Sequence, residues 1–247
     1  MRIAVAGGTG LTGRHVVDRL GSQGHQPVVL ARSAGVDLVA GTGIDDALAG
    51  VDAVIDVSNI VTQSRPKAVE FFETAGRNLT AAASRAGVRH LVTLSIIGID
   101  DVDTGYYAGK RAQERIARES GVPWTILRAA QFHEFTDQLL GLVPGPIAVI
   151  PTMLSQPIAV AEVADALISA ATSEPVGMAP ELAGPRPRHQ PELARRLLRA
   201  RGSRRLVVPI PMPGAAGRGM RDGKLLPQGD GPRGIQTFEE WLTQQGS

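Results

Sequence analysis

The sequence contains no cysteine, and this absence excludes disulfide bonds, thiolate catalysis and cysteine-based metal sites. Its five histidines lie far apart, and no two have the spacing of paired metal ligands, so we expect no bound metal. No apolar run approaches the roughly 20 residues that are needed to cross a bilayer. The first residues are typical of a strand and not of a secretion signal. These absences predict a cytoplasmic protein with no membrane partner.

The sequence also lacks a strong charge of either sign. Its formal net charge of +2 is too small to indicate nucleic acid as a partner. The arginine-rich stretch 193–205 could bind an anionic surface, but we expect a solvated helix face with Leu193, Leu197 and Leu198 turned inward. Hydrophobic residues make up 43% of the chain, enough for a sizeable core. The expected partner is a small-molecule substrate, and the expected state is a monomer or homodimer.

Short apolar runs alternate with amphipathic stretches in the first half of the chain, which is the pattern of a parallel sheet covered by helices. Prolines and glycines become frequent after about residue 135. The fold class that we predict is α/β, with a Rossmann-type doubly wound parallel sheet and a smaller C-terminal lobe on the substrate side. Strands are expected at 3–6, 27–31, 36–40, 51–57, 90–95 and 124–128, helices at 13–23, 66–86, 106–120, 161–171 and 191–200, a loop over 209–234, and a terminal helix at 238–242 that packs Trp241 into the fold.

A glycine-rich turn, GGTGLTG at residues 7–13, follows the first expected strand. In such a turn one glycine permits the tight bend, another lets backbone N–H groups approach a pyrophosphate, and a third lets helix and strand pack closely. The start of the next helix then faces the phosphates with its unpaired N–H groups. Because the turn joins a strand to a helix inside a βαβ unit, we expect it to bind a dinucleotide rather than to be a purely structural turn.

The second expected strand ends in Leu30-Ala31-Arg32-Ser33. A site for NAD usually has a carboxylate at this point, whereas an arginine suits the 2′-phosphate of NADP. Arg32 and Ser33 therefore favour NADP(H) over NAD(H), and Arg14 could add a second positive charge. The alternative is that Arg32 is only a solvated arginine at a strand end.

Tyr106 and Lys110 lie four residues apart at the start of an expected helix, so both can face one ligand. A free tyrosine has a pKa near ~10, and a nearby ammonium would lower that pKa. The pair could then exchange a proton with an oxygen at the reacting carbon, and Lys110 could also hold the nicotinamide ribose. Ser95, at the end of the preceding strand, could orient the substrate oxygen. The alternative is that Ser95 only forms a hydrogen bond with the local backbone.

Six segments, taken in order, give the chain a family resemblance. They are GGTGLTG at 7–13, VVLAR at 28–32, VDAVIDVSN at 51–59, AGVRHLVTLSIIG at 86–98, YYAGKRAQERIARESGVPWTILRAAQFHEF at 106–135 and IAVAEVADAL at 158–167. In these segments the chain resembles the atypical short-chain dehydrogenase/reductase proteins, and within them the NmrA-like, NAD(P)H-binding branch. The resemblance implies a single NAD(P)-binding domain over 1–247, with a Rossmann core at 1–135 and a dependent substrate-side lobe at 136–247.

The resemblance also implies roles for individual residues. The cofactor would contact Gly7, Thr9, Gly10, Leu11, Thr12 and Gly13 at the pyrophosphate, Arg32 and Ser33 at the 2′-phosphate, Ser58, Asn59 and Lys110 near the nicotinamide-side ribose, and Ala130. The catalytic positions would be Tyr106, Lys110 and Ser95. Gln131, Phe132 and His133 would line the substrate pocket, although His133 is equally typical of a packing or surface histidine.

One segment departs from the family pattern. Many relatives have Gly-Asp after the third strand, where this chain has Gly41-Thr42, so Asp37 and Leu38 are alternatives for the adenine contact. The branch also contains members that use the cofactor as a redox signal. A non-catalytic NADP(H)-sensing regulatory protein is therefore the alternative function, and an isomerase or epimerase is a third.

Because the chain retains Ser95, Tyr106 and Lys110, we expect an enzyme. The predicted function is an NADP(H)-dependent oxidoreductase that transfers hydride between nicotinamide and a small organic carbonyl or quinone-like substrate.

Overall fold

The computed structural model describes residues 1–245, which divide into two compact units. The first unit contains Met1–Ser95, Thr104–Arg128 and Ala161–Ala179, and the second contains Ile96–Asp103, Ala129–Val160 and the described residues from Pro180 onward. Both units are therefore built from segments that are far apart in the sequence. The prediction of one domain with a core at 1–135 stays a prediction. Within the described residues, no helix is long and apolar enough to cross a membrane.

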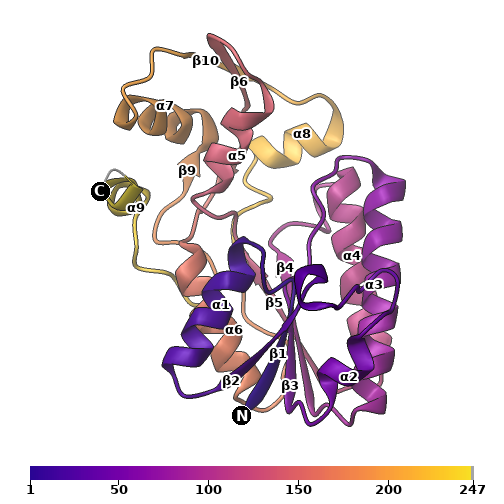
Figure 1. Cartoon of the computed structure of the whole chain (residues 1–247). Helices are drawn as coiled ribbons and strands as arrows, with labels where there is room; N and C mark the ends of the chain where they lie inside the picture. The colour runs from indigo at the N-terminus through magenta and orange to yellow at the C-terminus, as the bar shows by residue number, and fades with distance from the viewer. Residues whose placement is uncertain (246–247) are drawn as a thin grey trace. The chain divides into compact units, whose positions relative to one another are not determined.

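A six-stranded sheet in the order β2-β1-β3-β4-β5-β8 forms the centre of the first unit. β1 pairs in parallel with both β2 and β3, β3 with β4, and β5 with β8. Helices α1 and α6 lie on one face of the sheet, and α2, α3 and α4 on the other (Figure 1). The predicted Rossmann-type doubly wound sheet is confirmed. The strands are β1 (Arg2–Ala6), β2 (Gln26–Leu30), β3 (Ala53–Asp56), β4 (His90–Ile96), β5 (Trp124–Ala129) and β8 (Gly177–Met178), and the helices are α1 (Leu11–Ser22), α2 (Ile44–Leu48), α3 (Arg65–Arg85), α4 (Gly105–Glu119) and α6 (Val160–Ala171).

The core of this unit explains why α3 and α4 cover the sheet where they do. Apolar side chains of β1, β3, β4 and β5 pack against α3 and α4, and Leu79 and Ala83 of α3 are almost fully buried there. Gly109 lets the two helices approach closely, because a Cβ at this position would lie 2.7 Å from the Phe72 ring. The close approach brings Phe72 onto the first turns of α4.

The strand predicted at 36–40 is wrong. A short 3₁₀ helix, η1 (Arg32–Ala34), is followed by a turn in which Asp37 Oδ1 accepts the N–H groups of Val39 and Ala40. Asn78 of α3 donates to the carbonyl oxygens of Leu38 and Val39, so these backbone groups are satisfied without a sheet partner. The apolar residues looked like a strand, but local hydrogen bonds of Asp37 compete with the ladder.

The second unit contains a parallel pair, β10 with β6, and an antiparallel pair, β7 with β9. Leu193, Leu197 and Leu198 are buried with Phe238 and Trp241, so the inward face of the arginine-rich helix and the docking of Trp241 are as predicted. The loop predicted over 209–234 is wrong in part, since α8 forms within it and β10 reaches Ile210. The elements are α5 (Phe135–Leu142), β6 (Ile147–Pro151), β7 (Leu154–Ser155), β9 (Arg188–His189), α7 (Gln190–Ala200), β10 (Leu206–Ile210), α8 (Gly214–Arg221) and α9 (Phe238–Gln245).

Candidate functional site

The glycine-rich turn connects β1 to α1 by a path that only glycine permits at two positions. Gly7 has a φ of 78°, in the left-handed region that favours glycine. A Cβ on Gly13 would lie 2.1 Å from the carbonyl oxygen of Gly7, well inside contact distance. The first helical hydrogen bond of α1 runs from Arg14 N–H to Gly10 O, at 3.0 Å. The N–H groups of Leu11, Thr12 and Gly13 come before the first helical hydrogen bond. Gly10, the N-cap, has no side chain to cap them.

This geometry fits a pyrophosphate. The exposed residues Thr9 and Gly10 lead into the first turn of α1, whose N–H groups precede the helical hydrogen bonds and where the positive end of the helix dipole lies. Leu11 is half-buried and Thr12 is buried, so the chain is held in place at the start of α1. The residues present therefore suit a dinucleotide.

Arg32 and Ser33 lie immediately after β2, in η1, and both side chains are exposed. No carboxylate occupies the end of this strand. The nearest acid in the sequence, Asp37, is engaged by backbone N–H groups of Ala40 and Val39, which hold the pKa of its carboxyl below the usual range. The end of β2 thus presents a guanidinium and a hydroxyl, which is suitable chemistry for a phosphate.

Tyr106 lies in the first turn of α4, which begins where Thr104 Oγ1 accepts the N–H of Tyr107 at 3.1 Å. The Tyr106 hydroxyl donates to Asn59 Oδ1 at 2.7 Å, so Tyr106 contacts the loop after β3. The ring also packs edge-on against Phe72, with 6.0 Å between centroids. Two predicted site residues, Asn59 and Tyr106, are therefore brought into direct contact. Ser58, beside Asn59, is buried.

The prediction that Lys110 lowers the pKa of Tyr106 is wrong for this structure. Burial raises the pKa of Tyr106, and neighbouring Tyr107 raises it further. The Lys110 ammonium donates to Leu94 O at 2.6 Å and to Gln113 Oε1. It also lies 5.0 Å from the centre of the Phe72 ring. At neutral pH Tyr106 is a protonated phenol.

Lys110 is 4% exposed, and burial lowers its pKa to about 8 although Asp56 and Glu114 act in the opposite direction. Gln113 Nε2 donates in turn to Asp56 Oδ2 at 2.7 Å. Asp56 and Gln113 are polar site residues that sequence reasoning missed. Gln113 lies three residues after Lys110, on the same helix face, and Asp56 is the charged residue at the end of an apolar strand. Both signals were present in the sequence.

Ser95 is 1% exposed and lies in β4, whose residue Thr93 pairs with Asp56 across the sheet. Within residues 1–245, Ser95 Oγ has no hydrogen-bond partner, so the local backbone bond considered as its alternative is absent. A buried hydroxyl without a partner is uncommon and calls for a ligand, a water or a functional reason. The role of Ser95 at the substrate oxygen stays a prediction.

The four predicted residues after β5 belong to the second unit. Ala130 N–H donates to Leu182 O at 2.9 Å, and Gln131 O accepts the N–H of Ile158. Phe132 forms a β-bridge with Ile158. His133 is almost fully buried against Phe238 and Trp241, whose ring centroids lie 5.5 and 5.8 Å away. His133 thus has the environment of a packing histidine.

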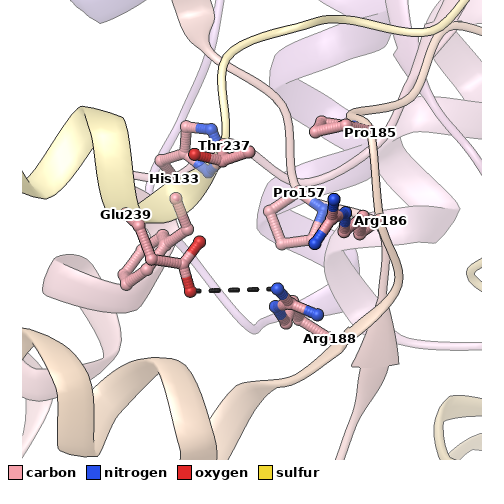
Figure 2. A pocket seen from close by; sticks show the side chains of 8 residues that line it. His133, Pro157, Pro185, Arg186, Arg188, Thr237 and Glu239 are labelled. Atoms are coloured by element: carbon pink, nitrogen blue, oxygen red, sulfur yellow. Dashed lines mark ion pairs between the residues drawn. The ribbon is translucent and has the colours of Figure 1, made fainter.

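His133 also borders a small cavity of about 10 Å³, enough for one water molecule. Figure 2 shows Arg186 and Arg188 on one side of this cavity and His133, Thr237 and Glu239 on the other. Arg188 and Glu239 approach to 3.8 Å across it. The assignment of 130–133 to the cofactor and substrate stays a prediction.

Comparison with known proteins shows which family the chain resembles. The model of the NAD(P)H-binding family matches residues 7–174. A reductase of Streptomyces griseus, named for (4-alkanoyl-5-oxo-2,5-dihydrofuran-3-yl)methyl phosphate, is 36% identical over 157 residues, which are 58% of this chain and 51% of the relative. The photosystem II assembly factor Ycf39 of Synechocystis is 30% identical over 148 residues, 53% of this chain and 45% of the relative. The aligned segment thus spans about half the length of each relative.

The structure of an NADPH-dependent quinone oxidoreductase from Escherichia coli superposes with a TM-score of 0.69, at 18% identity, over 99% of this chain and all of the other. This likeness shows a shared fold.

Proposed function

Because the chain belongs to the NAD(P)H-binding family of atypical short-chain dehydrogenase/reductase proteins, we propose that it is an NADP(H)-dependent oxidoreductase acting on a small organic carbonyl or quinone-like substrate. The observation that carries the proposal is the position of Tyr106, a protonated phenol in the first turn of α4, hydrogen-bonded to Asn59. The Streptomyces relative, which is named a reductase, supports the same reaction class.

The cofactor would be held by the turn at residues 7–13 and by Arg32 and Ser33 at its 2′-phosphate. When bound there, the reduced cofactor would supply the hydride that the substrate carbon receives. Tyr106 holds a proton at its hydroxyl and delivers it to the oxygen that gains negative charge. Burial raises the pKa of Tyr106, so its phenol carries the proton at neutral pH and is in the form that can donate it.

Ser95 and Lys110 support this step in different ways. Ser95 Oγ, buried and without a protein partner among residues 1–245, would donate to the substrate oxygen and orient it. Lys110 has three N–H donors, and Leu94 O and Gln113 Oε1 take two of them. The third N–H is left for the nicotinamide-side ribose or for the tyrosine oxygen.

The chain offers a matched pair of variants, because its only two tyrosines are neighbours. NADPH oxidation is followed with a panel of aldehydes, ketones and quinones. We expect Tyr106→Phe to lower kcat by about 10²–10⁴-fold, since it removes the proton donor. Tyr107→Phe should keep most of the activity. Full activity in Tyr106→Phe would refute the proton-transfer role.

The same measurement addresses the alternative function. If NADPH binds tightly but no acceptor in the panel is reduced by the wild-type chain, the non-catalytic NADP(H)-sensing protein replaces the oxidoreductase.

A further inference from the structure

A buried carboxylate, Asp56 at the end of β3, joins the two members of the tyrosine–lysine pair. Its Oδ2 accepts from Gln113 Nε2 at 2.7 Å, and Gln113 Oε1 accepts from the Lys110 ammonium. Its Oδ1 accepts the backbone N–H of Ser58 at 2.9 Å. Asn59, the next residue, accepts from the Tyr106 hydroxyl. One carboxylate is therefore connected to Lys110 through Gln113, and to Tyr106 through the Ser58–Asn59 segment.

Two hydrogen bonds connect Asp56 to Lys110 through the Gln113 side chain. The Asp56 carboxylate polarises the Gln113 amide, whose carbonyl oxygen then faces the ammonium, so each hydrogen bond strengthens the next. Both side chains are almost fully buried, Asp56 at 3% exposed and Gln113 at 2%, so water screens this interaction little. An uncompensated ammonium at this depth would tend to lose its proton.

The other carboxylate near Lys110, Glu114, forms hydrogen bonds with two arginines. Glu114, on the same helix, accepts from Arg128 of β5 and from Arg118, in contacts of 2.8 Å. From α3 the ammonium meets the uncharged Phe72 ring, and from β4 it meets the carbonyl oxygen of Leu94. Asp56 is therefore the carboxylate whose hydrogen-bonded chain ends on Lys110.

We propose that Asp56 and Gln113 are positioning residues that keep the Lys110 ammonium charged and in place, while Asp56 also fixes the Ser58–Asn59 loop that holds Tyr106. The use of Lys110 and Tyr106 in catalysis rests on the proposed function. The coupling of Asp56 to Lys110 does not, because it belongs to the folded chain.

The sequence makes a direct test possible, since it contains three lysines, Lys67, Lys110 and Lys224. The protein is labelled with ¹³C at lysine Cε and titrated by NMR. Lys67 is exposed and Lys224 is 53% exposed, so their signals serve as internal references. We expect the Lys110 midpoint near 8, as burial lowers its pKa to about 8. In Asp56→Asn and in Gln113→Met the midpoint should fall by about one unit, because the ammonium loses its compensating partner.

Asp52→Asn is the matched control, with the same substitution at the residue that directly precedes β3, four positions before Asp56. At about 3.3 Å per residue it lies roughly 13 Å from Asp56, and its carboxylate is bound by the Arg2 N–H and by Arg89. We expect its Lys110 midpoint to equal that of the wild type. An unchanged midpoint in both Asp56→Asn and Gln113→Met would overturn the proposal, as would an equal shift in Asp52→Asn. If only one of the two test variants folds, its midpoint alone decides the question: a fall supports the proposal, and an unchanged midpoint overturns it.

The pH profile of NADPH-dependent reduction supplies a second readout. Its basic limb should move to lower pH in Asp56→Asn and Gln113→Met by the shift seen in the NMR titration. A purely structural role would lower the rate without moving this limb. If the NMR midpoint moves but the limb does not, the catalytic part of the proposal is wrong. If the wild type reduces nothing, the proposed function fails while the NMR titration still tests the coupling.

Discussion

Replacing Gly13 by alanine perturbs the cofactor turn at its most crowded point. The added Cβ would lie 2.1 Å from Gly7 O and 2.6 Å from the Cα of Gly8. Real Cβ contacts are essentially never shorter than 3.0 Å, so the Gly7 carbonyl must retreat by about 0.9 Å, the difference 3.0 − 2.1. That carbonyl also accepts the N–H of Gly10 at 2.9 Å, so the same movement weakens the turn.

The expected cost combines overpacking, about 1–3 kcal/mol, with a weakened hydrogen bond worth about 1 kcal/mol. We therefore expect Gly13→Ala to lower the free energy of unfolding by about 2–4 kcal/mol, measured by urea denaturation with circular dichroism. Affinity for NADPH, measured by fluorescence titration, should weaken at least about tenfold, because the N–H groups of the first helical turn are displaced.

Gly21→Ala, in the same helix, is the control. A Cβ at Gly21 meets nothing within 4 Å, so alanine should raise the free energy of unfolding by about 0.4–1 kcal/mol and leave NADPH affinity unchanged. If Gly13→Ala proves as stable as the wild type and binds NADPH equally well, the reasoning about the close approach is wrong.

Three further predictions concern other parts of the chain. Arg32→Ala should weaken NADPH binding about tenfold or more while NADH binding changes little, as measured by parallel titrations; equal losses would remove Arg32 from the 2′-phosphate. Glu114→Gln should lower the free energy of unfolding by about 3 kcal/mol, since it removes a carboxylate that is 3% exposed and forms an ion pair with the Arg128 guanidinium, 14% exposed; a loss below about 1 kcal/mol in urea titration would contradict this. Trp241→Ala should cost about 3–5 kcal/mol by the same titration, because its ring packs on His133 and Phe238 and its indole N–H donates to Glu134; no loss would mean that α9 does not stabilise the second unit.

Much of the fold could be predicted because its signals are local. The glycine turn, the apolar run that became β3 and the amphipathic stretch that became α3 are each read within one segment. The match of the NAD(P)H-binding family model supports the family resemblance inferred from the six motifs.

The errors occur where distant or side-chain contacts decide the structure. β6 and β10 pair in parallel although Ile147 and Leu206 are far apart in the sequence, so no local pattern marks them. The turn at 36–40 depends on Asp37 and on Asn78 from a different helix.

In the candidate site too, the local features could be predicted from the sequence, whereas the features that depend on tertiary contacts could not. The spacing of Tyr106 and Lys110 correctly placed them on one helix, but the direction of the ammonium depends on Leu94 O and Gln113. The effect of burial on the pKa of Tyr106 likewise required the packing of α3 against α4.

Hydride transfer from NADPH to a substrate can be followed directly with a deuterium label. NADPH deuterated at the transferring position of C4 is incubated with the wild-type chain and with carbonyl and quinone-like acceptors, and the products are analysed by mass spectrometry and NMR. We expect one deuterium on the former carbonyl carbon of a reduced carbonyl product, formed at a rate that falls about 10²–10⁴-fold in Tyr106→Phe. Tight NADPH binding with no deuterium in any product would contradict it.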